Sequence, residues 1–168
     1  MASQYANIAL TVDATLTSAL DLTSAVSHLE YASRVELTTG TGANASDMQW
    51  SDTRTLAASG TENLDLAGSL TGPVGNTLTF ARIKAVVFKA AAGNTNNVQV
   101  TRPASNGVPL FMAAGDGISL APGETFAWFS PTAAGKAVTA ATGDLLTFTN
   151  SAGSTGVTYD IVVIGASA

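Results

Sequence analysis

Turn residues divide most of this chain into short runs of strand-forming residues, and this punctuation constrains the fold more than any other feature. From residue 47 onward the turn signals recur at short intervals, as in Asn106-Gly107, Gly115-Asp116-Gly117 and Pro122-Gly123. The runs between them are rich in Val, Thr, Ile and Phe, which favour strands. Short strands separated by turns predict an all-β antiparallel sandwich or barrel, and we expect a jelly-roll-like β-sandwich.

The strands expected in this part of the chain follow from the same pattern. The longest is LTFARIKAVVFKA (78–90), and the last is VTYDIVVIG (157–165). The sequence predicts further strands over 48–56, 62–66, 98–103, 124–130, 137–140 and 144–150. The sequence has no repeat of fixed period, which argues against a solenoid or a propeller.

The first 30 residues are harder to place, because they are rich in Ala, Ser and Thr and only weakly periodic. Three interpretations remain open: an ordered first strand, a mobile terminus, or an arm that docks on a neighbouring molecule. A short helical turn near residues 22–29 is also expected. The predicted organisation is therefore a less regular N-terminal segment or arm, residues 1–30, followed by a single β-sandwich domain, residues 31–168.

Composition narrows the classes of partner. The chain has 168 residues, no cysteine, 11% charged residues and a formal net charge of −5. The scarcity of clustered Lys and Arg argues against a nucleic-acid partner, whose phosphates such residues neutralise. No run reaches the roughly 20 apolar residues of a membrane span, and no signal peptide is visible. We therefore expect neither nucleic acid nor a membrane as a partner.

Candidate catalytic and metal-binding residues form no recognisable motif. His28 is the only histidine, and no G-x-S-x-G pattern accompanies it. Asp52 and Arg54 are two apart, which predicts an ion pair on the solvated side of a strand. A calcium site using Asp116 and Asp144 would lack the D-x-[DN]-x-[DN]-G signature. The expectation is a protein that is not an enzyme and has no catalytic residues, metal site or cofactor.

Several strands present large side chains on both faces. In 78–90, one alternate set contains Phe80, Arg82, Lys84, Val86 and Phe88, whereas Ala81, Ile83, Ala85 and Val87 are expected to face the core. Phe126 and Trp128 share one face of their strand, and Phe129 lies on the other. Strands with two apolar faces predict contact with other subunits. The candidate subunit or capsid interface comprises Phe80, Arg82, Lys84, Phe88, Phe126, Trp128, Phe129 and Tyr159.

Three stretches together carry a family resemblance: GTGANASDMQWSDTRTLAASGTENLDLAGSL (40–70), GNTLTFARIKAVVF (75–88) and TGDLLTFTNSAGSTGVTYDIVVIGASA (142–168). They resemble small β-rich virion structural proteins of tailed bacteriophages. The resemblance implies no catalytic residues. Members of this kind include capsid decoration (cement) proteins, which sit as trimers on the outer shell, and also tail or head-fibre components. Because the chain is compact and lacks a repetitive shaft, we expect a decoration protein that is made in the host cytoplasm, binds the major capsid protein on the outer capsid surface as a homotrimer, and stabilises the shell.

Two other functions remain as alternatives. A tail or head-fibre component with a carbohydrate- or receptor-binding jelly roll would stack a sugar on an exposed tryptophan, and Trp50, among polar neighbours, is a better candidate than Trp128. A hydrolase would need two carboxylates held across a groove, and no motif supports one. Fold class alone does not decide among these functions.

Overall fold

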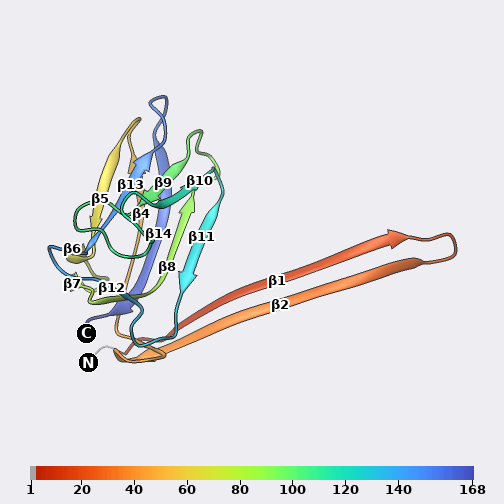
Figure 1. The fold of residues 1–168 in the computed structure, drawn as a ribbon, viewed down its shortest axis with the longest axis horizontal. Helices are drawn as coiled ribbons and strands as arrows, with labels where there is room; N and C mark the ends of the chain where they lie inside the picture. The colour runs from red at the N-terminus through yellow and green to blue at the C-terminus, as the bar shows by residue number, and fades with distance from the viewer. Residues whose placement is uncertain (1–2) are drawn as a thin grey trace.

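Fourteen strands make up the structure, a computed structural model that describes residues 3–168 (Figure 1). Within that range the chain forms strands, turns and loops but no helix. The strands are β1 (Ala6–Ala19), β2 (Ser24–Thr39), β3 (Ala45–Ser46), β4 (Met48–Leu56), β5 (Thr61–Asp65), β6 (Ala67–Thr71), β7 (Thr77–Thr79), β8 (Arg82–Ala90), β9 (Val98–Thr101), β10 (Gly117–Leu120), β11 (Thr125–Phe129), β12 (Lys136–Ala137), β13 (Leu145–Asn150) and β14 (Val157–Ala166).

Eight of these strands form two antiparallel four-stranded sheets. One sheet has the order β10-β9-β13-β5, and the other has the order β11-β8-β14-β4, with β12 added beside β8. The first of the eight strands therefore pairs with the last, the second with the seventh, the third with the sixth and the fourth with the fifth. This nested pairing is that of a jelly roll, so the predicted all-β jelly-roll sandwich is confirmed.

The hydrophobic core lies between the two sheets. Alternate residues of each strand point into it, as Leu146 and Phe148 do from β13 and Ile161 and Val163 do from β14. Its aromatic centre is well packed: the rings of Phe148 and Tyr159 stack at 4.6 Å, and Phe88 meets Phe148 edge-on at 5.4 Å. Large side chains from both halves of the chain thus hold the sheets together.

The N-terminal segment is a long two-stranded arm and not the less regular segment expected. β1 and β2 pair antiparallel along their whole lengths, from Ala6 opposite Leu37 to Ala19 opposite Ser24. Figure 1 shows this arm extending far beyond the sandwich. The expected helical turn near residues 22–29 is wrong, because β2 begins at Ser24. Residue 30 lies inside β2, and the arm continues to Thr39.

A bulge between β8 and β14 changes which residues of β8 face the core. Ile83 is in the core as expected, but so are Val86 and Phe88, while Val87 is on the outer face. The register shifts between Ile164 and Gly165, and this places an extra residue in β8. The prediction that Val87 faces the core, with Val86 and Phe88 on the other face, is therefore wrong. A Cβ at Gly165 would lie 2.2 Å from the Arg82 carbonyl oxygen, so the bulge requires glycine.

Candidate functional site

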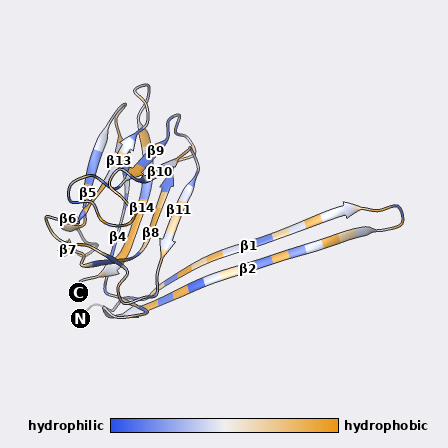
Figure 2. Cartoon of the chain, viewed as in Figure 1, coloured by the Kyte–Doolittle hydropathy of each residue, from blue (hydrophilic) through white to orange (hydrophobic). Residues whose placement is uncertain are grey.

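The arm is amphipathic, with one apolar and one polar face. Residues directly opposite in an antiparallel pair share a face, and the hydropathy alternates along both strands (Figure 2). The apolar face consists of Ala6, Ile8, Leu10, Val12, Ala14 and Leu16 with their partners Leu37, Val35, Ser33, Tyr31, Leu29 and Ser27. The opposite face carries every charged side chain of β1 and β2: Asp13, Glu30, Arg34 and Glu36.

Burial of the apolar face falls from the root of the arm to its tip. Leu37 is fully buried, and Ala6 and Val35 are each only 9% exposed. Further out, Leu10 is 49% exposed and Leu16 is 74% exposed. The sandwich therefore covers only the root, and the distal apolar face lies open to solvent. We call the open part, formed by Leu10, Val12, Ala14 and Leu16 with Ser33, Tyr31, Leu29 and Ser27, the distal arm face.

The root is held by a second, smaller hydrophobic cluster. Ala6, Val35 and Leu37 pack there with Ile8 and with two side chains of the sandwich, Phe129 from β11 and Ile164 from β14. The loop that follows the arm adds a backbone hydrogen bond, in which the Asn44 N–H donates to the Pro131 carbonyl at 2.8 Å. The arm is thus anchored on the outer face of the β11-β8-β14-β4 sheet.

Lys84 is buried beside this root and is used as an internal clamp. Its ammonium donates to the carbonyl oxygens of Gly42 at 3.1 Å, of Ala133 at 2.8 Å, and of Thr132. Gly42 follows the arm and the other two belong to the β11–β12 loop, so one charge joins two separate loops. Burial lowers the pKa of Lys84, and the nearby charge of Arg82 lowers it further.

The predicted interface residues divide into two groups. Phe80, Phe88 and Tyr159 lie in the sandwich core and Lys84 is the buried clamp, each with at most 1% of its surface exposed. These four side chains stabilise the protein's own fold and present no surface to a partner. Sequence alternation alone missed this because the jelly roll itself covers the face that was assigned to another subunit.

The remaining predicted interface residues are half-buried at the edge of the sandwich. Phe126 and Trp128 pack against the main core, whereas Phe129 points to the opposite face and packs on the arm root. The prediction that Phe126 and Trp128 lie opposite Phe129 is confirmed. The face bearing Phe129 is covered by the chain's own arm. Arg82 is half-buried and donates to the Ala168 carbonyl at 2.8 Å.

The two tryptophans do not have the exposures expected from their neighbours. Trp50 is only 8% exposed and belongs to the main core, so its assignment as the more exposed tryptophan is wrong. Trp128 is the more exposed of the two, and the Lys136 ammonium lies 5.6 Å from the centre of its ring. One face of Trp128 therefore packs on the core while a cation contacts the ring.

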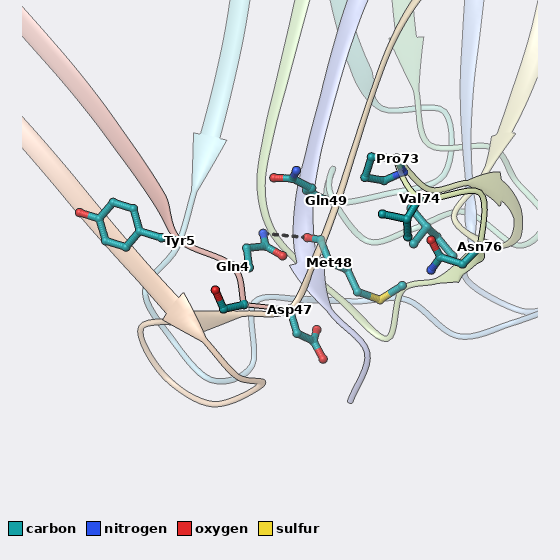
Figure 3. Close-up of a pocket in the computed structure, with 10 residues that line it drawn as sticks. Gln4, Tyr5, Asp47, Met48, Gln49, Pro73, Val74 and Asn76 are labelled. Atoms are coloured by element: carbon teal, nitrogen blue, oxygen red, sulfur yellow. Dashed lines mark hydrogen bonds between the residues drawn. The ribbon is translucent and has the colours of Figure 1, made fainter. Parts of the chain in front are cut away.

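A cavity of about 350 Å³ lies where the start of the arm meets the sandwich (Figure 3). Gln4 lines one side of it and donates from Nε2 to the Met48 carbonyl at 3.2 Å. Pro73 and Val74 from the β6–β7 loop line the other side, and the Tyr5 ring points away from them. Val74 is 84% exposed, so this is an open hollow at a junction between segments.

A polar network joins the two sheets at one edge. Arg54 on β4 donates to Glu62 Oε2 on β5 from Nε at 2.9 Å and from Nη2 at 2.6 Å, while Tyr159 donates to Glu62 Oε1 at 2.6 Å. Arg54 also contacts Asp52 at 3.2 Å, so the predicted Asp52–Arg54 pair is confirmed. Burial raises the pKa of Glu62, but the hydrogen bonds from Arg54 and Tyr159 lower it more, to below 4.5.

The other candidate polar residues have local structural partners. His28 on the arm forms a hydrogen bond with Thr15 at 3.1 Å. Asp116 accepts from the Ala113 N–H at 2.7 Å, and Asp144 accepts from the Ala141 N–H at 2.5 Å, so both carboxylates cap turns. Among residues 3–168, no three His, Cys, Asp or Glu side chains are grouped to hold a metal ion.

The arm is the surface that sequence reasoning left undefined. The signal for it was present: apolar residues at every second position from Ile8 to Val12 and from Leu29 to Leu37, interrupted by Ser33, around a turn at Asp21. In the part of the chain that the structure covers, no helix is long and apolar enough to cross a membrane. Comparison of the chain with protein families, with curated proteins and with solved structures finds no match.

Proposed function

We propose that this protein is a structural component of a tailed-phage virion, a decoration protein that binds the major capsid protein on the outer surface of the shell and stabilises it. The arm is the observation that carries the proposal. Fourteen residues of β1, at about 3.3 Å each, give the arm a total length of about 45 Å, root included. A small jelly roll with such an arm can connect positions on a shell that its own core does not touch.

The exposed side chains of the arm support an assembly role. A two-stranded ribbon is at best marginally stable alone in water, and contiguous exposed apolar surface marks interaction sites. Leu16, Leu29 and Tyr31 are each more than half exposed on one face of this ribbon. An arm of this kind gains stability when another molecule covers that face.

The carbohydrate-binding alternative is less well supported. Sugar stacking uses an open aromatic face beside polar groups, whereas Trp50 is in the core and Trp128 is contacted by Lys136. The three stretches that resemble phage virion proteins include β4, most of β8, β13 and β14 of the sandwich. The resemblance and the arm together favour a structural protein over a receptor-binding module.

Imaging of labelled particles tests the proposed location. Antibody fragments raised against the folded protein are added to intact particles of the phage that encodes it, and the particles are viewed by electron microscopy. We expect label over the whole capsid shell in many copies. Label confined to the tail or to a few fibres would replace decoration by the tail or head-fibre function, and unlabelled particles would remove the virion assignment.

A further inference from the structure

The outer face of the β11-β8-β14-β4 sheet carries an apolar patch next to the arm root. Ala127, Val87 and Val162 are paired neighbours across three strands, and Phe129, Ala85 and Ile164 form the adjoining row. The first row is partly open to solvent, with Val162 36% exposed. We call this open row, Ala127, Val87 and Val162, the outer patch. The next row beyond it is polar and contains Lys89 and Asp160.

Within one chain, the apolar face of the arm already packs against the outer face of this sheet at the arm root. At the root, Ala6, Ile8, Val35 and Leu37 of the arm's apolar face pack on Phe129 and Ile164 of the outer sheet face. The distal arm face is the continuation of the arm's apolar face beyond the root, and the outer patch is the continuation of the apolar sheet face beyond Phe129 and Ile164. Both continuations lack charged side chains, so neither would bury an unpaired charge against the other.

The arm's direction leaves both continuations uncovered within one chain. Figures 1 and 2 show the arm running away from the sandwich after its root, so its distal half does not lie over its own outer sheet face. The buried root cluster and the clamp of Lys84 on the Gly42 carbonyl fix that direction. The distal arm of one chain therefore does not cover its own outer patch, and an arm that does so comes from another copy.

The contact at the arm root favours a second copy of this chain as the occupant of the outer patch, because another copy carries the same arm face and the same outer sheet face. The distal arm face is about seven residues long and two strands wide, roughly 230 Å². The outer patch is three strands wide and one row deep, roughly 100 Å², so one arm on one patch would bury roughly 200 Å² in total. Reciprocal docking of two copies doubles this to roughly 400 Å², well below the roughly 1,000 Å² of stable interfaces, so the association is expected to be weak and to require a high protein concentration. A closed arrangement of copies also covers every arm and every patch.

We propose that the distal arm face of one copy docks on the outer patch of a second copy, continuing the contact that each arm root makes with its own sheet. Leu16, Leu29 and Tyr31 provide the apolar contacts on the arm, and Val87 and Val162 receive them. This inference does not depend on binding to a capsid. It is therefore tested with the purified protein alone, so its failure and the failure of the decoration function are distinguishable.

Disulfide cross-linking between two separately purified variants tests the contact directly, because the chain has no cysteine of its own. Leu16→Cys places a thiol on the distal arm face, and Val162→Cys places one on the outer patch. Mixed under mild oxidation, the two variants are expected to form a covalent heterodimer seen on a non-reducing gel. Thr17→Cys, one residue along the arm and on its polar face, is the matched control and should cross-link at least tenfold less.

Each alternative occupant gives a different result. Cross-linking of Leu16→Cys to itself, without the heterodimer, would show that two arms pack together and would overturn the proposal. Equal cross-linking by Leu16→Cys and Thr17→Cys would show random collision and would also overturn it. The folded state of each variant is checked by circular dichroism, since all three positions are at the surface of the protein.

Light scattering and sedimentation measure the same contact without cross-linking. The native chain is expected to self-associate, and Leu16→Asp should weaken the association by about tenfold or more, which corresponds to about 1.4 kcal/mol. Thr17→Asp adds the same charge on the polar face and should change it less than about threefold. A native chain that stays monomeric at high concentration would overturn the proposal.

Discussion

At the scale of single residues, Lys84 shows how a charged side chain can serve the interior. Its three hydrogen-bond acceptors are all backbone carbonyls, so the ammonium satisfies loop groups that would otherwise lack partners. An unpaired buried polar group costs about 1–3 kcal/mol. Lys84, which the sequence predicted as an interface residue, therefore connects the loop after the arm to the β11–β12 loop by hydrogen bonds.

Replacing this lysine should destabilise the fold. Lys84→Met keeps most of the apolar stem but leaves the carbonyl oxygens of Gly42, Thr132 and Ala133 without their donor. We expect the free energy of unfolding, measured by chemical denaturation, to fall by about 2 kcal/mol. Lys89→Met, on the same strand but exposed, should change it by less than about 0.5 kcal/mol. Equal effects in both variants would contradict the clamp.

The Glu62 network gives the stability of the sandwich a pH dependence. The folded-state pKa of Glu62 lies below its ordinary value of 4.5, so its contribution is present above that pH and is lost as the pH falls through the folded-state pKa. Glu62→Gln should lower the free energy of unfolding by about 1 kcal/mol at pH 7. The difference from the native chain should shrink below pH 4.5.

Asp52→Asn is the matched control for this effect. Asp52 meets Arg54 by one contact at 3.2 Å, and its side chain is 45% exposed, against 22% for Glu62. A partly exposed ion pair of this kind contributes little to stability. Denaturation curves from pH 3 to pH 8 that show the same pH dependence for the native chain and for Glu62→Gln would exclude the proposed role of the network.

At the scale of secondary-structure elements, the arm behaves as a unit attached at one end. Its strands pair with each other over their whole lengths, and the described contacts with the sandwich are at the root. Replacing residues 11–32 by Asn-Gly, which favours a tight hairpin turn, would shorten the arm but keep the root. We expect the sandwich to keep its unfolding free energy within about 1 kcal/mol and self-association to be lost.

The effect of the shortened arm on capsid binding is measured by adding the shortened variant to capsid shells that lack this protein and determining its occupancy. If the arm joins neighbouring copies there, occupancy at low protein concentration should fall, because each molecule then binds without its neighbours. A variant that restores full occupancy at the same concentration as the native chain would show that the sandwich alone carries the attachment. The arm would then have no part in decoration.

At the scale of the whole molecule, association links stability to concentration. A contact that forms only between folded copies stabilises them by mass action. We therefore expect the apparent Tm of the full chain to rise as protein concentration increases, while that of the shortened variant stays constant. Calorimetry over a hundredfold range of concentration measures both. A rise of equal size in the two proteins would place the association on some surface other than the arm.

The sequence by itself determined most strands of the sandwich, its turns and its all-β class, because strand propensity and turn chemistry are local properties. Of the strand expected over 137–140, only the start belongs to a strand, β12 (Lys136–Ala137). The sequence also contained the amphipathic pattern of the arm. Only the tertiary structure decided which faces are covered. The bulge at Gly165 reversed the faces of β8, the packing of the two sheets buried Trp50, and two loops beside the arm root enclosed Lys84. A period of two residues says which side chains share a face, but long-range packing decides whether the core, the chain's own arm or solvent lies against it.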